Sequence, residues 1–187
     1  NKNADNFAKT TINVDFYETQ NRFSTLLPEH GYILDFGCGS GRDTKYFLEQ
    51  GFYVDATDGS EEMCHIAGNY TGIQVRRLLF EELDENKKYD GIWACASILH
   101  LPKNELKAVF MKMFKALKDD GIIYTSFKYG DFEGERNGRY FTDFTEKTFE
   151  EFVGEIDNLQ LKEEWITGDV RPGRGEEKWL NVILQKN

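Results

Sequence analysis

Short apolar runs alternate with amphipathic stretches along the middle of the chain. Buried strands are predicted at four of these runs, residues 32–36, 52–58, 89–96 and 122–127. Apolar residues at helical spacing follow the first three runs and predict helices at residues 42–50, 61–69 and 104–117. Because strands and helices alternate, the pattern predicts an α/β fold in which parallel strands are joined by helical crossovers.

The flanking segments have other patterns. Before Pro28, apolar residues at near-helical intervals predict one or two helices between residues 7 and 27. After the fourth strand, residues 128–143 are rich in glycine and charge and are expected to form a loop. Thr145 is then expected to cap a short helix that ends near Val153.

Two runs of alternating apolar and polar residues complete the pattern. They cover residues 159–166 and 179–184 and flank a loop rich in glycine and arginine at 168–177. Strict alternation is typical of half-buried strands, so the runs predict an antiparallel pair.

The length and composition favour a single domain. The chain has 187 residues, of which 40% are hydrophobic, and this is enough apolar material for one packed core. We expect one domain over residues 1–187, with a helical lid at 1–30 and substrate-side loops at 128–143 and 168–177.

The charge excludes several classes of partner. Lys and Arg number 23 against 33 Asp and Glu, and the net charge of -10 would repel a phosphate backbone, so no nucleic-acid partner is expected. No apolar run approaches the roughly 20 residues of a membrane span, and residues 1–5 lack signal-peptide character. We expect a cytoplasmic protein, a monomer or weak homodimer, that does not bind membranes. The three cysteines and three histidines lack metal-ligand or disulfide spacing, so no metal is expected.

A glycine-rich turn follows the first predicted strand. Gly37, Gly39 and Gly41 come shortly after Asp35, and their lack of side chains lets the backbone turn sharply and approach a ligand. A dinucleotide fingerprint would need its third glycine at position 42, which is Arg42. The spacing therefore favours a cofactor without a pyrophosphate.

Asp58 ends the second predicted strand. A carboxylate at this position can accept hydrogen bonds from both hydroxyls of an adenosine ribose. Two alternatives remain open, since the glycine turn also suits plain strand-to-helix geometry and Asp58 also suits a cap for the helix that starts near Ser60.

Four segments of the chain resemble the class I S-adenosylmethionine-dependent methyltransferases. They are 33–41 (Ile-Leu-Asp-Phe-Gly-Cys-Gly-Ser-Gly), 58–60 (Asp-Gly-Ser), 89–93 (Tyr-Asp-Gly-Ile-Trp) and 116–121 (Ala-Leu-Lys-Asp-Asp-Gly). Three further segments resemble the bacterial tellurite-resistance-type branch of that superfamily, namely 41–43, 93–100 and 127–130. The resemblance implies S-adenosylmethionine as cofactor and a Rossmann-like, mostly parallel seven-stranded sheet with helices on both faces. It also implies the strand order 3-2-1-4-5-7-6, with the last strand antiparallel.

The resemblance further implies roles for residues of the turn and the strand ends. Asp35 would support the turn near the methionine amino group of the cofactor, the three glycines would line the amino-acid tail, and Asp58 would hold the ribose. Phe80 would cover the adenine face while Glu81 or backbone groups meet the exocyclic amine, with a core role for Phe80 left open. Independently of the resemblance, Tyr17 on the predicted N-terminal helix is a candidate to close over the cofactor as part of a lid, with core packing as its alternative. The remaining expected cofactor residues are Cys38, Arg42, Gly59, Ser60, Met63 and Ala96.

Methyl transfer from a sulfonium is an in-line displacement, so the protein mainly aligns the nucleophile and excludes water. Soft anions such as selenolate need no base, whereas an alcohol or an ammonium group does. His100 follows the fourth predicted strand, at the sheet edge where ligands bind. It is the candidate base, or alternatively a residue that fixes the turn before Pro102.

Cationic residues gather in the two expected substrate-side loops, namely Lys128, Arg136, Arg139, Arg171 and Arg174. Guanidinium groups suit an oxyanion or carboxylate acceptor because they form bidentate hydrogen bonds. Arg139 is expected to be the best positioned, since Tyr140 and Phe141 can anchor it against the core. The alternative is surface pairing with nearby acids, which are Asp131, Glu133, Glu135, Glu176 and Glu177.

The resulting functional expectation is methyl transfer from S-adenosylmethionine to a small-molecule acceptor, such as an oxyanion, a chalcogen species or a small carboxylate. One alternative is a non-catalytic S-adenosylmethionine-binding module, since fold does not fix function. Another is an NAD-dependent oxidoreductase, which the glycine spacing and the end of the chain soon after the first nucleotide-binding sheet disfavour. Residues 96–99 lack the Asn/Asp-Pro-Pro-aromatic motif of amine-directed nucleic-acid methyltransferases, which again favours a small molecule.

Overall fold

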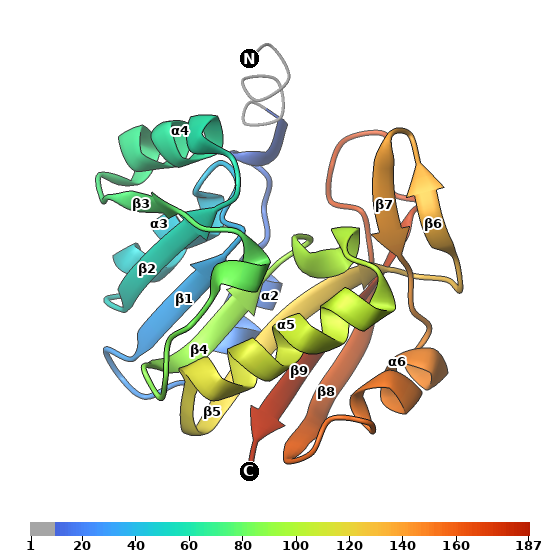
Figure 1. Cartoon of the computed structure of the whole chain (residues 1–187). Coiled ribbons are helices and arrows are strands. Elements are labelled where there is room, and N and C mark those ends of the chain that lie inside the picture. The colour runs from blue at the N-terminus through green and yellow to red at the C-terminus, as the bar shows by residue number, and fades with distance from the viewer. Residues whose placement is uncertain (1–9) are drawn as a thin grey trace.

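Seven strands form one mixed sheet in the order β3-β2-β1-β4-β5-β9-β8 in the computed structural model, which describes residues 10–187 (Figure 1). The strands are β1 (Tyr32–Phe36), β2 (Tyr53–Asp58), β3 (Val75–Arg77), β4 (Tyr89–Ala94), β5 (Leu117–Lys128), β8 (Leu159–Gly168) and β9 (Lys178–Lys186). The first five pair in parallel, and β9 runs antiparallel to both β5 and β8. The predicted strand order and its antiparallel last strand are confirmed.

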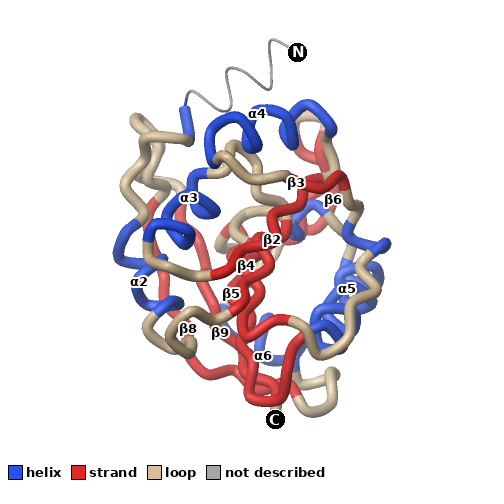
Figure 2. Tube along the Cα trace, turned by 90° about the vertical axis from the view of Figure 1, so that its left-hand side faces the viewer, coloured by secondary structure: helices blue, strands red, loops and turns tan. Residues whose placement is uncertain are grey.

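Helices cover both faces of this sheet, with α2 and α3 on one side of the strands and α5 on the other (Figure 2). The helices are α2 (Tyr17–Ser24), α3 (Arg42–Glu49), α4 (Glu61–Thr71), α5 (Lys103–Ala116) and α6 (Glu146–Val153), with short 3-10 helices η1 (Phe80–Glu82) and η2 (Ile98–His100). One apolar cluster joins the sheet to α5 and α6, and a second, around Trp93, joins it to α2 and α3. Both faces of β1 and β4 are therefore buried, which explains why these strands are continuous apolar runs.

The boundary between α5 and β5 differs from the prediction. The helix ends at Ala116, and Leu117, expected as its last residue, begins a strand predicted to start only at 122. The longer strand contains a register shift, because β4 pairs first with Leu117 and next with Ile122. Asp120 adopts a positive φ of 62° within this irregular stretch.

The segment 128–143, expected to be a loop, contains a β-hairpin instead. Strands β6 (Glu133–Arg136) and β7 (Arg139–Thr142) pair antiparallel around Asn137 and Gly138. These two turn residues have φ values of 54° and 75°, the positive values that a tight two-residue hairpin turn requires. Asn-Gly was the available sequence signal, but the polar composition of the segment obscured it.

The outer segments agree with the remaining predictions where the structure describes them. Helix α2 lies in the predicted N-terminal helical region, whereas residues 1–9, including the predicted helix start at residue 7, lie outside the described part. Thr145 caps α6 by accepting a hydrogen bond from the Thr148 amide at 3.3 Å, as predicted. Within residues 10–187, no helix is both long and apolar enough to cross a membrane.

Candidate active site

A cavity of about 730 Å³ lies at the carboxyl ends of the parallel strands. Its walls come from the glycine turn after β1, the end of β2, the loop after β4, strand β7 and the segment that follows β8. The strand order reverses between β1 and β4, and open α/β sheets bind their ligands at this kind of switch point. The volume is within the range of about 300 to 1,000 Å³ typical of small-molecule sites.

The glycine turn needs its glycines for packing as well as for approach to a ligand. Gly37 has a φ of 86°, and a Cβ on it would stand 2.5 Å from the Cβ of Ser97. Gly41 has a φ of 84°, and a Cβ there would stand 2.8 Å from a methyl carbon of Thr71. Larger residues at either position would push the turn away from the loop after β4 or from α4.

Asp58 lies on the cavity wall at the end of β2. Its Oδ2 accepts a hydrogen bond from the Gly39 amide at 3.0 Å, and its Oδ1 accepts one from the Ser60 amide at 2.9 Å. Ser60, rather than Asp58, caps α4, because its hydroxyl accepts from the Met63 amide. Each carboxylate oxygen of Asp58 keeps a further lone pair for a ligand hydroxyl.

A largely buried ion pair lines the cavity beside the glycine turn. The Arg42 guanidinium donates to both carboxylate oxygens of Asp43, at 2.8 and 2.9 Å, and Trp93 and Gln20 donate to the same carboxylate at 2.9 and 2.7 Å. Burial opposes charge on Asp43, but Arg42 and the other donors hold the pKa of this carboxyl below its usual value. The Phe16 ring covers the Arg42 guanidinium at 4.6 Å.

Asp35 lies under the turn and does not line the cavity. Its carboxyl is 2% exposed and accepts a hydrogen bond from the Thr44 hydroxyl at 2.5 Å. Burial, followed by the nearby charge of Asp43, raises the pKa of Asp35 to about 8. Supporting the turn is compatible with this position, whereas contact with the methionine amino group is not, because Asp35 is enclosed by the protein.

Asp35 predicts a pH dependence of stability. The unfolded chain releases this proton near its ordinary pKa of about 3.9, whereas the folded chain keeps it up to about 8. Between these values the folded state binds more protons, so the contribution of Asp35 to stability falls as the pH rises. In Asp35→Asn the side chain is neutral throughout, and we expect urea unfolding to show a smaller loss of stability between about pH 5 and pH 8 than in the parent. An equal loss in both proteins would contradict the protonated state of Asp35.

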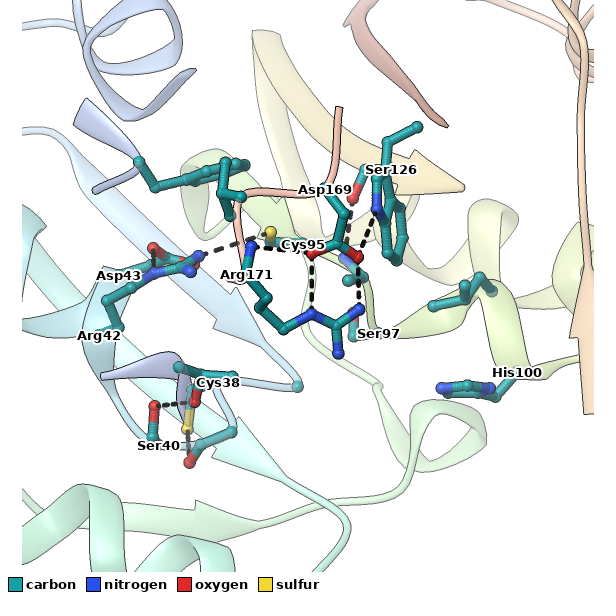
Figure 3. A pocket seen from close by; sticks show the side chains of 18 of the residues that line it. Cys38, Ser40, Arg42, Asp43, Cys95, Ser97, His100, Ser126, Asp169 and Arg171 are labelled. Atoms are coloured by element: carbon teal, nitrogen blue, oxygen red, sulfur yellow. Dashed lines mark hydrogen bonds and ion pairs between the residues drawn. The ribbon is translucent and has the colours of Figure 1, made fainter. Parts of the chain in front are cut away.

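The opposite end of the cavity is cationic. Its lining includes four cationic side chains, Lys128, Arg139, Arg171 and Arg174. Arg171 donates to both oxygens of the buried Asp169, Arg174 donates to Glu177 at 2.5 and 2.8 Å, and Lys128 is paired with Glu177. Figure 3 shows the Arg171–Asp169 pair between the glycine turn and His100.

Arg139 differs from the other cations of the cavity. Within residues 10–187 its side chain has no hydrogen bond, ion pair or ring contact, whereas Arg136 is held by two hydrogen bonds to Asp143, at 2.8 and 2.7 Å. Arg136 also lies between the rings of Phe132 and Phe141, at 4.6 and 4.7 Å, and outside the cavity lining. Arg139 is thus the guanidinium best placed to meet a ligand.

His100 lines the cavity at the end of η2. Its Nδ1 lies 2.8 Å from the Tyr140 carbonyl oxygen, and its ring meets Phe141 edge to face with ring centres 4.6 Å apart. Burial lowers the pKa of His100, and the charge of Arg139 lowers it further.

The structure brings most of the sequence-predicted site residues together. Those that line the cavity are Gly37, Cys38, Gly39, Arg42, Asp58, Gly59, Ser60, Met63, Phe80, Ala96, His100, Lys128, Arg139 and Arg171. Those that lie outside its lining are Tyr17, Asp35, Gly41, Glu81 and Arg136. Tyr17 is 57% exposed and rests against Tyr46, so neither of its two predicted positions, over the cofactor or in the core, matches.

Several lining residues were not predicted from the sequence. The most consequential are Phe16, Asp43, Cys95, Ser97, Asp169 and Trp179. Asp43 directly follows the glycine turn, which was an available local signal. Asp169 and Trp179 had none, because their role depends on contacts made only after β8 and β9 pair.

The charges of the lining suit a particular type of cofactor. The wall around the glycine turn carries the carboxylates of Asp43, Asp58 and Glu62, and its one guanidinium, Arg42, is already bonded to Asp43. Such a wall favours a ligand with sulfonium and ammonium charges and opposes a pyrophosphate. The donor set therefore fits S-adenosylmethionine.

Comparison with known proteins agrees with this geometry. Residues 33–121 match the family model described as a methyltransferase domain. A putative methyltransferase of Bacillus subtilis is 34% identical over 116 residues, which cover 56% of this chain and 47% of that protein. The chain thus spans about half the length of this curated relative.

Solved structures show the same fold. The 1,6-didemethyltoxoflavin-N1-methyltransferase of Burkholderia thailandensis, crystallised with 1,6-didemethyltoxoflavin and S-adenosylhomocysteine, has a TM-score of 0.76 and 25% identity, covering 91% of this chain and 77% of its own. A TehB-like methyltransferase of Corynebacterium glutamicum has a TM-score of 0.72 and 20% identity, covering 100% and 99%. At that identity the second likeness shows the fold alone.

Over residues 33–121 the chain matches a methyltransferase domain, and its fold is that of S-adenosylmethionine-dependent methyltransferases. The comparisons confirm the class and the cofactor that the sequence predicted for this domain. The narrower tellurite-resistance-type resemblance is only one among several likenesses, because neighbours of other kinds match equally well.

Proposed function

We propose that this chain transfers the methyl group of S-adenosylmethionine to a small-molecule acceptor that carries an anionic group. The observation that supports this proposal is the charge polarity of the cavity. Carboxylates predominate at the end beside the glycine turn, whereas four cationic side chains and the carboxylate of Asp169 line the end formed by β5, β7 and the segment after β8. A cationic cofactor and an anionic acceptor would each meet the opposite charge.

Residues at the end of the cavity beside the glycine turn would hold the cofactor. Asp58 offers the free lone pairs of its carboxylate to the ribose hydroxyls, and Phe80 offers a ring for the adenine face. Arg42 keeps its Nη1 unused by Asp43 and offers it to the cofactor carboxylate. When bound, S-adenosylmethionine supplies an activated methyl group whose bond to sulfur breaks with the electron pair staying on sulfur. The protein then has to position the acceptor and exclude water.

Arg139 would receive the anionic group of the acceptor. It is the cavity-lining guanidinium without a side-chain partner in the described part of the chain, and it lies at the start of β7. Arg171 and Arg174 are already neutralised by Asp169 and Glu177, so they would contribute shape and residual hydrogen bonding more than net charge. Oxyanions, chalcogen species with acidic groups and small carboxylates all satisfy this chemistry.

The test is a screen with S-adenosylmethionine labelled in its methyl group, against hydroxycarboxylates, aminocarboxylates, thiols, selenite and tellurite. For an acceptor that is methylated, Arg139→Ala should lower kcat/KM at least about tenfold, which corresponds to about 1.4 kcal/mol, while cofactor affinity stays within about twofold. Arg139→Lys should restore part of the loss, because a point charge lacks the planar two-bond geometry.

Arg22→Ala is the matched control, since Arg22 lies on α2 and pairs with Glu163 away from the cavity. A parent-like rate of Arg139→Ala with an anionic acceptor would contradict the assigned role of Arg139. Tight cofactor binding without turnover of any acceptor would instead favour a non-catalytic binding module.

A further inference from the structure

The hairpin β6–β7 connects the candidate anion receptor to His100. Three consecutive residues of β7 take part, because Arg139 lines the cavity, Tyr140 places its carbonyl 2.8 Å from His100 Nδ1, and Phe141 packs against the imidazole. Strand β7 is held in turn by the Thr142 hydroxyl, which donates to the Leu101 carbonyl next to His100 at 2.7 Å. The position of His100 and that of Arg139 therefore depend on one element.

The contact with Tyr140 fixes the tautomer of His100. A carbonyl oxygen can only accept a hydrogen bond, so Nδ1 must carry the hydrogen. In the neutral ring Nε2 then has a free lone pair. Nε2 has no protein partner within residues 10–187, and the side chain lines the cavity.

We propose that His100 Nε2 is the proton acceptor of the methyl transfer, and that the substrate presents a hydroxyl or amine nucleophile next to the anionic group held by Arg139. This inference rests on the proposed function and narrows its substrate class. The proton leaves the oxygen or nitrogen of the acceptor for Nε2, and a lone pair on that atom forms the new bond to the methyl carbon. At the same time the bond between the methyl carbon and sulfur breaks, and its electron pair stays on sulfur. Acceptors that are already soft anions, such as selenolate or a reduced tellurium species, have no proton to give and would not need this residue.

The charges around His100 make its basicity depend on whether the acceptor is bound. Strand β7 contributes Arg139, whose charge opposes protonation of His100. Strand β5, the other strand packed against η2, contributes Lys128, which is paired with Asp169 and Glu177. An acceptor anion bound at Arg139 would offset the charge of Arg139, so His100 would become a stronger base when the substrate is in place.

Nitrogen-15 NMR of histidine-labelled protein tests the geometry without knowledge of the acceptor. In the complex with S-adenosylhomocysteine we expect His100 to show a protonated Nδ1, an unprotonated Nε2 and a pKa below about 6.5. Addition of benzoate, an anion without a protic nucleophile, should raise this pKa by about half a unit or more, and Arg139→Ala should abolish that response. His30 and His65 are exposed and lie outside the cavity, so they serve as internal controls.

Kinetics completes the test. With salicylate, anthranilate and other hydroxy- or aminocarboxylates as acceptors, His100→Gln should lower kcat by about 100-fold or more and remove the acidic limb of the pH profile, whereas His65→Gln should leave both unchanged. An Nε2-protonated ring, a pKa insensitive to benzoate, or undiminished turnover by His100→Gln would overturn the inference while leaving methyl transfer itself in place. Failure of S-adenosylhomocysteine to bind would instead overturn the proposed function.

Discussion

Replacement of Asp43 by alanine is expected to lower the free energy of unfolding by about 3 to 5 kcal/mol, because it leaves the largely buried guanidinium of Arg42 without its counter-charge. Arg42 spends two of its donors on Asp43, and Trp93 and Gln20 also donate to that carboxylate. The variant would leave the buried donors of Trp93 and Gln20 without a partner and Arg42, which is 17% exposed, without its counter-charge. Urea unfolding followed by circular dichroism measures the change.

The loss of stability in Asp43→Ala should come from the uncompensated charge of Arg42 rather than from the loss of the ion pair itself. The double variant Arg42→Met, Asp43→Ala removes both charges. Its loss of stability should therefore be no more than slightly larger than that of Asp43→Ala alone, and we expect it to be smaller. Asp84→Ala, which removes an exposed carboxylate paired with Lys115, should leave stability unchanged. A loss below about 1 kcal/mol in Asp43→Ala would mean that the pair is not a structural support of the turn.

The second large effect concerns the cofactor. Asp58→Ala should weaken binding of S-adenosylhomocysteine by roughly 1.5 to 3 kcal/mol, which is a factor of about 10 to 150 in Kd. The substitution removes the ribose acceptor and also releases the amides of Gly39 and Ser60, which the carboxylate holds at 3.0 and 2.9 Å. Calorimetric titration reports the loss directly.

Two further variants test whether the weaker binding comes from the carboxylate of Asp58 itself. Asp58→Asn keeps one hydrogen-bond acceptor and should bind with intermediate affinity. Glu61→Ala removes an exposed carboxylate from the first turn of α4, outside the cavity, and should bind as the parent does. Unchanged affinity in Asp58→Ala would remove Asp58 from the cofactor site.

The sequence was most informative where function depends on local geometry. The parallel crossovers followed from apolar runs that alternate with helical stripes, whereas the strand order followed from the family resemblance. The cavity positions of Gly37, Gly39 and Asp58 followed from their places at two strand ends. Such features depend on residues close together in the chain, so the local sequence pattern predicts them.

Features that depend on distant contacts were not predicted. Asp43 is bonded to Trp93, 50 positions away, and no local pattern marks either residue as the other's partner. The expected pairing of cations with surface acids holds for Arg174 with Glu177, but Arg171 and Arg136 take Asp169 and Asp143, which were not among the acids considered. Asn137 and Gly138 were a local signal for the hairpin, yet the mean composition of residues 128–143 favoured a loop.

The hairpin matters because it affects which of its two arginines is available to a ligand. In a free loop Arg136 and Arg139 would be comparable candidates. In the pairing observed between β6 and β7 they lie opposite each other, and one is bonded to Asp143 while the other lines the cavity. The contacts of each side chain, rather than the strand register, thus distinguish the arginine held by Asp143 from the one that lines the cavity.

The most direct test of the central claim is calorimetric titration of the protein with S-adenosylhomocysteine, S-adenosylmethionine and NAD. The carboxylate-lined glycine turn predicts one binding site for each of the two S-adenosyl compounds and no heat with NAD. It also predicts that Asp58→Ala weakens the S-adenosyl compounds only. Binding of NAD, or the absence of binding by both S-adenosyl compounds, would contradict the account.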